Sequence, residues 1–429
     1  MLARALVRRF PVFGYRDFVL LLADRLLAPA AFAFSLVGVS FAVLDATGST
    51  ADLSYVLAAQ IAPSLVFALV GGVIADRLPA QWVIIAGNMM IALGEGAFGV
   101  LDLAGHPRLW QMVMLEALTG TGMAIFYPAS QALLPRLVPG ALLQQASAIS
   151  RLATNAAQMG GAVVAGLCVA AFGPGWALAA CGVGSLISVP MLLSIRATGN
   201  ARTQETSMLR DLRDGWSEFR SHTWLWSISL QFGVVLMAWY GAFQILGPVV
   251  ARAHLGGPAA WGAITAADAI GLIAGGLVSL RFTPRRPMLF VVIIGAAIAI
   301  APLSLAMLWP LPLVCLASFG LGITIEIMMV QWTVTMARNI PPGKLARVSS
   351  YDLLGSVMAM PIGALIAGPL AAAIGVSVTQ YGAAVLIVAA SALALIPRDV
   401  RRMRSDAPVL EEDQATSSAS PVNAAHIAA

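Results

Sequence analysis

The chain has 429 residues, of which 59% are hydrophobic and 10% are charged, with a mean hydropathy of +0.86 and a formal net charge of +5. This composition excludes a water-soluble globular protein, because such a protein needs far more charge to cover its surface. It also excludes a nucleic-acid-binding protein, because the basic residues are dispersed between apolar segments rather than gathered in one patch.

The apolar segments predict an all-α membrane protein with twelve transmembrane helices. Each span needs about 20 apolar residues, since the hydrocarbon core of a bilayer is about 30 Å thick. The expected spans are 17–43, 53–75, 82–103, 109–133, 144–170, 174–195, 223–249, 259–280, 287–306, 312–336, 349–373 and 377–397.

The basic residues predict the orientation of these spans. With the N-terminus in the cytoplasm, the cytoplasmic connections and both tails hold 21 of the 25 basic residues, whereas the outer loops hold Arg108 and Arg252. Such an asymmetry is the positive-inside pattern of membrane proteins. We therefore expect a multi-pass protein of a bacterial inner membrane with both termini cytoplasmic.

The longest internal polar stretch, 196–222, divides the spans into two halves. It carries Leu209, Leu212, Trp216 and Phe219 at helical spacing, which predicts an amphipathic helix on the cytoplasmic surface. The expected organisation is an N-terminal six-helix bundle (1–195), this cytoplasmic linker (196–222), a C-terminal six-helix bundle (223–397) and a disordered cytoplasmic tail (398–429).

The two halves resemble one another at an offset of about 203 residues. The segment 71–77 (GGVIADR) aligns with 275–281 (GGLVSLR), Pro139-Gly140 with Pro342-Gly343, and 161–166 (GAVVAG) with 363–368 (GALIAG). The last pair of segments places small residues where helices can pack closely. Three matches in the same order predict two pseudo-symmetric bundles with a binding site between them.

At this point the chain resembles the major facilitator superfamily, over residues 10–397. The connection after the second span carries the signature of a glycine, three residues, then Asp-Arg, at Gly72, Asp76 and Arg77. The family pattern usually continues with a glycine and basic residues, whereas this chain continues with 78–81 (LPAQ), so the basic part is missing. The resemblance implies the major facilitator fold and transport by alternating access.

Within the superfamily, the chain is similar to the enterobactin-exporter-like branch, also called transmembrane secretion effectors. The segments that carry this similarity are 15–18 (YRDF), 43–49 (VLDATGS) and 131–139 (QALLPRLVP). The branch includes siderophore and antibiotic exporters, which implies efflux of a small amphipathic molecule.

Five acidic residues fall inside predicted spans, namely Asp24, Glu95, Glu116, Asp268 and Glu326. A charge near the middle of a bilayer costs roughly 3 kcal/mol on insertion scales, so such residues are usually functional or paired. Asp268, Glu326 and Asp24 are the candidates for proton coupling, because a carboxyl group there can bind and release a proton. The alternative for Asp268 and Glu326 is that the acid is protonated and bonded to a neighbouring helix, and Asp24 also fits a gate. Glu95 lies in a span that is peripheral in the resembling fold, which favours a structural role.

The candidate substrate contacts are Glu116 in the outer half of span four and four residues of span seven. Ligand pockets are mostly apolar with a few polar groups, and span seven offers Gln231, Trp239, Tyr240 and Gln244. Two alternatives stay open, because Glu116 also fits an outer gate and the two aromatic residues also fit an interfacial belt.

The candidate cytoplasmic gate consists of Gly72, Asp76 and Arg77 with the start of span eleven at Ser349 and Ser350. A carboxylate at Asp76 is favoured near unpaired backbone N–H groups at a helix N-terminus by about 0.3–1 kcal/mol. The alternative is that Asp76 and Arg77 only end the helix among lipid headgroups.

The sequence therefore predicts a secondary active transporter that exports a siderophore, antibiotic or drug-like compound in exchange for protons. Its expected partners are the substrate, protons and the lipid bilayer; we expect a monomer, no nucleic acid, no cofactor and no metal. No phosphate-binding G-x-x-x-x-G-K-[ST] motif or catalytic cluster is present in the sequence, which argues against an ATP-driven pump and an enzyme. The alternatives are an uptake or uncoupled transporter of the same fold, or a membrane sensor or integral-membrane enzyme.

Overall fold

A computed structural model describes residues 10–77, 79–105, 107–195, 216–282, 284–341, 344, 348–349, 351–352, 355–356 and 358–403, with no side-chain description at 64–77, 127–128 and 132. These residues form helices and turns, and no strand occurs among them. The predicted all-helical class is confirmed.

The first group of helices forms an N-terminal bundle. Its members are α2 (Arg16–Thr47), preceded by the short η1 (Pro11–Gly14), then α3 (Thr50–Arg77), α4 (Ala80–Leu103), α5 (Leu109–Leu137), α6 (Gly140–Phe172) and α7 (Pro174–Leu193). Within this bundle α4 packs against both α5 and α7, and α2 packs against α6 and α7.

The second group forms a C-terminal bundle. Its members are α9 (Thr223–Trp239), η2 (Tyr240–Ile245), α10 (Gly247–Val250), η3 (Ala251–Leu255), α11 (Pro258–Ser279), α12 (Pro287–Ala296), η4 (Ala297–Ala299), α13 (Ile300–Ala306), α14 (Leu311–Asn339), α16 (Met360–Ile374), α17 (Val376–Ala394) and α18 (Arg398–Arg402). Helix α11 packs along α14, and α17 packs against α9, α12 and α13.

Ten helical segments of the described residues are long and apolar enough to cross a membrane. They coincide with ten of the predicted spans. The two remaining predictions, 53–75 and 349–373, fall on α3, which has 28 residues, and on α16, which has 15. The multi-pass architecture is therefore confirmed, whereas the number twelve stays a prediction.

Glycines in left-handed backbone conformations make the turns at one end of the molecule. Gly48 ends α2 with φ 65°, Gly173 follows α6 with φ 92°, Gly256 follows η3 with φ 99°, and Gly375 follows α16 with φ 94°. A glycine adopts positive φ without the steric penalty that a side chain brings, so a helix can end and reverse within a few residues. We call this end of the molecule, defined by these four glycines, the closed end.

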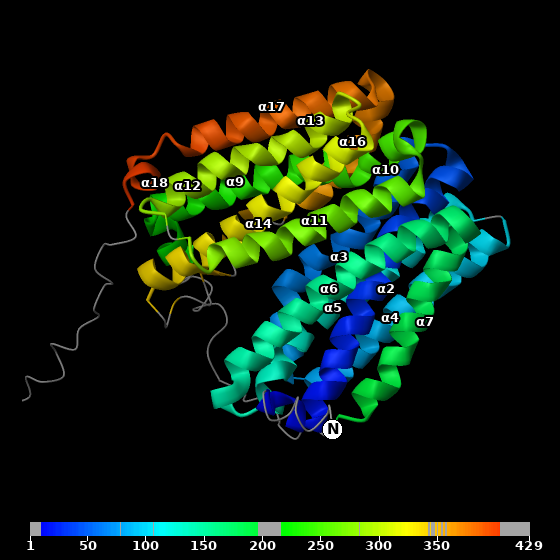
Figure 1. The fold of residues 1–429 in the computed structure, drawn as a ribbon, viewed down its shortest axis with the longest axis horizontal. Coiled ribbons are helices and arrows are strands. Elements are labelled where there is room, and N and C mark those ends of the chain that lie inside the picture. The colour runs from blue at the N-terminus through cyan, green and yellow to red at the C-terminus, as the bar shows by residue number, and fades with distance from the viewer. Residues whose placement is uncertain are drawn as a thin grey trace, which may run out of the picture.

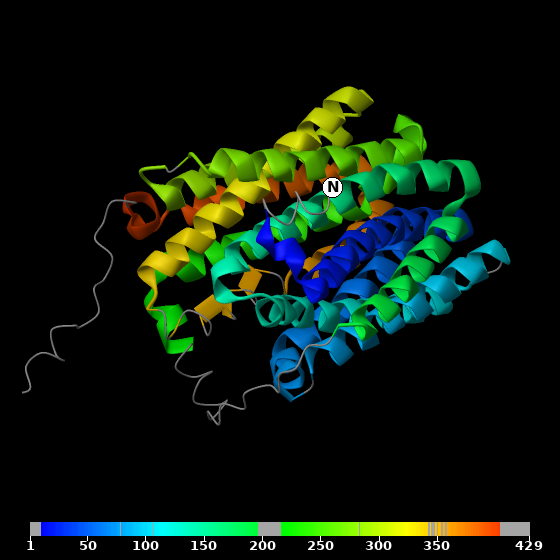
Figure 2. The ribbon, with the colours of Figure 1, turned by 60° about the horizontal axis from the view of Figure 1, so that its bottom comes forward.

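The two bundles meet at the closed end. In Figure 1 the ribbons of α2–α7 and α9–α17 converge toward the upper right and diverge toward the lower left, and Figure 2 shows the same grouping from another side. Helix α6 packs against α11 and α3 packs against α16, and α2 also contacts α10 and α11.

Small residues allow these two crossings. A methyl group added at Gly166 on α6 would lie 2.9 Å from the Cα atom of Gly262 on α11, and Gly368 on α16 packs against the backbone of Thr50 on α3. The hydroxyl of Thr50 donates a hydrogen bond to the Gly368 carbonyl at 3.4 Å. Gly166 and Gly368 end the two repeated segments 161–166 and 363–368, so the repeat forms corresponding contacts in the two halves.

Two π-helical segments, η2 and η3, interrupt the long helix that runs from Thr223 to Leu255. Pro248 follows η2 closely; it has no N–H to donate, and in a regular helix its ring would clash with the carbonyl four residues earlier, at Gln244. This widens the helix at residues 240–245, where Tyr240 and Gln244 are located. Short π-helical segments of this kind occur frequently at functional sites.

Candidate functional site

Four buried polar side chains join four helices of the N-terminal bundle. The Ser35 hydroxyl on α2 donates to Glu95 Oε1 on α4 at 2.5 Å, and Gln60 Nε2 on α3 donates to Glu116 Oε2 on α5 at 2.7 Å. Gln60 Nε2 also lies 3.5 Å from the Ser35 hydroxyl, which connects the two pairs. We call Ser35, Gln60, Glu95 and Glu116 the acidic network.

Close backbone contacts hold these helices in register. Gly94, next to Glu95, packs against Thr119 and the Leu115 carbonyl on α5. Gly120, one turn after Glu116, packs directly against the backbone carbonyl of Gln60. Because a side chain at either glycine would separate the helices, these contacts place the two carboxyl groups near each other.

The acidic network is buried and includes carboxylate oxygens without a hydrogen-bond partner. The side chains of Ser35, Glu95 and Glu116 are fully buried. Glu95 Oε2 and Glu116 Oε1 have no hydrogen-bond partner, and the two carboxyl groups are close enough to interact electrostatically. Among the described residues, no basic side chain forms a hydrogen bond or ion pair with either acid.

Tyr240 of the opposite bundle lies near the acidic network. It is buried at the start of η2, and it lies near enough to the Glu116 carboxyl for the two groups to interact electrostatically. The Trp239 ring packs edge-on against Tyr240, with 6.2 Å between ring centroids. Of the predicted substrate contacts, the structure thus brings Glu116, Trp239 and Tyr240 together across the bundle interface.

The other two predicted substrate contacts lie elsewhere on the same span. Gln231 Nε2 donates to the Ser391 hydroxyl on α17 at 3.0 Å, inside the C-terminal bundle. Gln244 lies within η2 and is partly buried.

Asp24 and Arg25, adjacent on α2, contact different helices. Asp24 Oδ1 accepts a hydrogen bond from Asn88 on α4 at 3.4 Å, whereas Arg25 donates to the Ser130 carbonyl on α5 at 2.9 Å and to Gln131 Oε1 at 3.3 Å. Residues next to each other on a helix point about 100° apart, which explains the different partners. Asp24 Oδ2 is buried without a partner.

The two acids of the C-terminal bundle lie along the α11–α14 contact. Asp268 on α11 is partly buried, and its Oδ1 atom has no hydrogen-bond partner. Glu326 on α14 packs against Gly275 and Gly276 of α11. The structure therefore places both predicted coupling residues on the same helix pair.

One acid of this bundle was missed by sequence reasoning. Asp352 accepts hydrogen bonds from the Ser229 hydroxyl on α9 at 2.5 Å and from the Trp332 indole N–H on α14 at 2.8 Å. The available signal was an aspartate four positions into the predicted span 349–373.

The predicted cytoplasmic gate lies mostly outside the described side chains. Helix α3 ends at Arg77, close to the predicted end of span two. The side chains of Gly72, Asp76 and Arg77 and all of Ser350 lie outside the described residues, and Ser349 is partly buried. The gate therefore stays a prediction.

An ion pair and an apolar cluster join the bundles at the closed end. Arg252 in η3 lies 2.7 Å from Asp45 at the end of α2, with both side chains about half exposed. Beneath this pair, Val56 and Leu57 of α3 belong to one buried apolar cluster with Ile245 and Leu246 of the C-terminal bundle. This cluster also includes Tyr240, so the closed end covers the acidic network.

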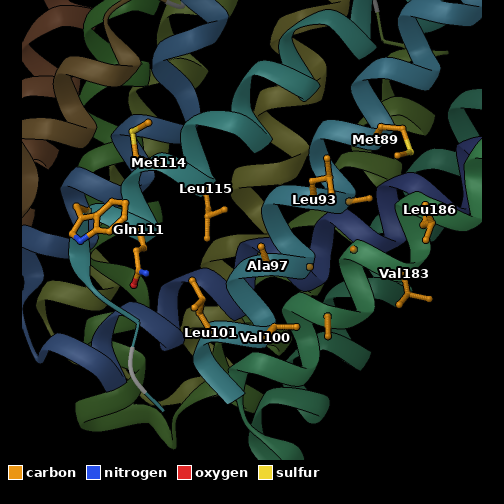
Figure 3. A pocket seen from close by; sticks show the side chains of 15 residues that line it. Met89, Leu93, Ala97, Val100, Leu101, Gln111, Met114, Leu115, Val183 and Leu186 are labelled. Atoms are coloured by element: carbon orange, nitrogen blue, oxygen red, sulfur yellow. The ribbon is translucent and has the colours of Figure 1, made fainter. Parts of the chain in front are cut away.

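A separate apolar groove of about 780 Å³ lies on the outside of the N-terminal bundle, between α4, α5 and α7 (Figure 3). Leu93, Val100 and Trp110 line it and are each more than half exposed. A surface of this kind on membrane-spanning helices suits contact with lipid chains rather than recognition of a polar substrate.

A family model described as Major Facilitator Superfamily matches residues 26–351. The chain is 27% identical over 347 residues to Enterobactin exporter EntS of Escherichia coli O1:K1, covering 79% of this chain and 82% of that protein. It is also 27% identical over 348 residues to Enterobactin exporter EntS of Citrobacter koseri, covering 80% and 82%.

Solved structures share the fold. The crystal structure of the nucleoside transporter NupG matches with a TM-score of 0.71 at 13% identity, covering 90% of this chain and 100% of that one. A bacterial homolog of the human lysosomal transporter Spinster, in an inward-facing and unoccupied conformation, matches with a TM-score of 0.64 at 17% identity, covering 89% and 96%.

Proposed function

The chain belongs to the major facilitator superfamily and is a membrane transporter rather than an enzyme, and on that premise we propose that it exports a small amphipathic molecule in exchange for protons. The observation that carries the proposal is the placement of buried acids beside the interface of the two bundles. Glu116 lies near enough to Tyr240 of the opposite bundle to interact with it electrostatically, so a change of charge there acts where the bundles must separate.

The arrangement of the bundles supports alternating access. The contacts of α6 with α11 and of α3 with α16 lie near the closed end, together with the Asp45–Arg252 ion pair. We infer that the closed end faces outward, because the positive-inside pattern puts the N-terminus and the linker on the opposite side. Rocking the bundles about their interface would then open the substrate site to each side in turn.

We assign proton coupling to Asp24, Asp268 and Glu326, and substrate contact to Glu116, Trp239 and Tyr240 together with Gln231 and Gln244. Aromatic surfaces with a few polar groups suit a siderophore, an antibiotic or a drug-like compound. The similarity to Enterobactin exporter EntS supports the efflux direction and the siderophore class.

The proposal is tested by flux measurements in inverted membrane vesicles. Enterobactin, a hydroxamate siderophore and a cationic dye are each offered with and without an imposed proton gradient, in vesicles with and without the protein. We expect gradient-dependent uptake of at least one compound into inverted vesicles, which corresponds to export from cells. An uptake rate that does not depend on the proton gradient would contradict proton coupling. Uptake only into right-side-out vesicles would contradict export.

A further inference from the structure

The hydrogen bonds of the acidic network do not compensate the negative charge of two ionised glutamates. Two glutamates are fully buried in one region, each with one carboxylate oxygen that has no hydrogen-bond partner in the protein. Burying a single unpaired carboxylate is costly, and burying two that interact with one another is more costly still. The donors supplied by Ser35 and Gln60 are neutral and serve one oxygen of each acid.

Among the residues that the structure describes, no basic side chain forms a hydrogen bond or ion pair with either glutamate. The titratable groups that face the pair are the Cys181 thiol from α7 and the Tyr240 phenol from η2, both neutral when protonated. Helices α2 and α3 contribute Ser35 and Gln60, which do not titrate. Arg25 donates hydrogen bonds to the Ser130 carbonyl and to Gln131 Oε1 on α5.

We infer that Glu95 and Glu116 share one proton and form a proton-binding site of the N-terminal bundle that Tyr240 seals when the closed end is shut. One proton leaves the pair with a single negative charge, and it provides a donor for an oxygen that otherwise has no partner. The inference rests on the proposed function in making this pair a coupling site, in addition to Asp24, Asp268 and Glu326.

The seal connects the proton to the movement of the bundles. Tyr240 reaches the pair from the C-terminal bundle and belongs to the apolar cluster that spans the interface. When the bundles separate at this end, Tyr240 withdraws and water gains access to Glu116. Protons from the side of the closed end therefore reach the pair only when that end is open.

The shared proton is tested by infrared spectroscopy of the purified protein in lipid, following the protonated carboxyl band during a pH titration. We compare wild type with Glu95→Gln, Glu116→Gln and the control Glu326→Gln. We expect each of the first two substitutions to shift the midpoint of the remaining acid by about one pH unit or more, because interacting acids titrate as a pair. Glu326→Gln should leave the band of the pair unchanged. Independent bands, each removed by one substitution without moving the other, would overturn the inference.

Two further arms keep the test decisive. If either glutamine variant fails to fold, Ser35→Ala replaces it, and it should shift the midpoint of the pair without removing a carboxyl group; an unshifted midpoint would overturn the inference. Exchanging Na⁺ for choline at constant ionic strength should leave the midpoints unchanged. A midpoint that moves with Na⁺ concentration would identify the site as a sodium site instead of a proton site.

Transport by Glu116→Gln separates this inference from the proposed function. Loss of gradient-driven flux with retained exchange of dye across the membrane would support the pair as a coupling site. Full gradient-driven flux in this variant would overturn the inference alone, whereas gradient-independent flux in wild type would overturn the proposed function and leave the infrared result to stand.

Discussion

At the scale of single residues, the Asp45–Arg252 ion pair directly joins the two bundles. Both side chains are about half exposed, and pairs of this kind contribute up to about 1 kcal/mol. We expect Asp45→Asn to shift the equilibrium toward opening of the closed end by up to roughly fivefold. Labelling of Leu246→Cys, a position buried in the apolar cluster beneath the pair, by an impermeant maleimide measures this opening.

The matched control for this experiment is the charge exchange Asp45→Arg with Arg252→Asp, in which the attraction is restored. We expect it to return labelling toward the wild-type rate. If the exchange variant is labelled as fast as Asp45→Asn, the attraction between the two charges does not hold the closed end.

Glu326 tests proton coupling in the C-terminal bundle. We expect Glu326→Gln to reduce gradient-driven transport while leaving insertion and proton-independent counterflow intact, because glutamine keeps the shape but cannot release a proton. The measurement is flux with and without a gradient, alongside Asp268→Asn on the neighbouring helix. Equal loss of counterflow would point to substrate binding or structure, and full activity of both variants would remove both residues from the coupling assignment.

The candidate residues were predictable from the sequence as individuals but not as groups. A carboxyl group inside an apolar span is visible in the sequence, which is why Glu95 and Glu116 were both singled out. Their proximity depends on how α5 packs against α4 at Gly94 and against α3 at Gly120, and no local pattern in the sequence predicts these contacts. Glu95 was predicted to be structural, because its span is peripheral in the resembling fold.

At the scale of elements, the contact of α6 with α11 offers a matched pair of glycines. A methyl group at Gly166 would meet the backbone of Gly262, whereas a methyl group at Gly160, on the same helix, would meet no atom within 4 Å. We expect Gly166→Ala to favour opening of the closed end by about 1–3 kcal/mol, the usual cost of overpacking. Gly160→Ala should have no such effect and should stabilise the helix by up to about 1 kcal/mol.

The same cysteine at position 246 reports the result for both variants. Faster labelling in Gly166→Ala with unchanged labelling in Gly160→Ala is the expected outcome. If the two variants label at the same rate, the close approach of α6 and α11 does not control closure.

The linker provides an element whose docking depends on pH. Residues 216–221 are helical, and Trp216 and Phe219 pack against Tyr351, with ring centroids 5.5 and 6.1 Å away. Glu218 accepts a hydrogen bond from the Lys344 ammonium at 3.0 Å, which lowers the pKa of the Glu218 carboxyl, and the His222 ring 3.2 Å away acts in the same direction. This contribution is present above the ordinary pKa of a glutamate and is lost as the pH falls through the lowered value.

We therefore expect acidification to loosen this short helix, which a spin label at the exposed position Ser217→Cys would report as increased mobility. The control Glu218→Gln should be mobile at neutral pH and respond less to acid. An identical response to acid in both proteins would show that the Glu218–Lys344 contact does not hold the linker.

Elements were predicted well where a pattern of apolar residues continues through a whole span. The two repeated small-residue segments were also predicted to permit close helix packing, and Gly166 and Gly368 do so across the bundle interface. The π-helical segments η2 and η3 were not predicted, because they preserve the apolar pattern of a continuous span. Pro248 accounts for η2, which lies in the turn before it, and nothing in the structure explains η3.

At the scale of the whole molecule, the two halves contact one another through corresponding helices. The crossing of α6 with α11 corresponds under the repeat to the crossing of α16 with α3, and both lie near the closed end. Such symmetry lets the bundles rock about a central axis without rebuilding either one. The acidic network lies inside one bundle and meets the other at Tyr240, so its protonation can bias this movement.

The central claim is that protonation controls an exchange between two arrangements of rigid bundles. Distances between pairs of spin labels test it directly, with one pair at exposed alanines of the closed end, Ala46 and Ala253, and another at exposed alanines of the opposite end, Ala141 and Ala337. With the native cysteines replaced, we expect a pH change to lengthen the first distance and shorten the second in the same fraction of molecules, and Glu95→Gln with Glu116→Gln to abolish this response. Distances that do not change with pH, or that lengthen at both ends together, would contradict the account.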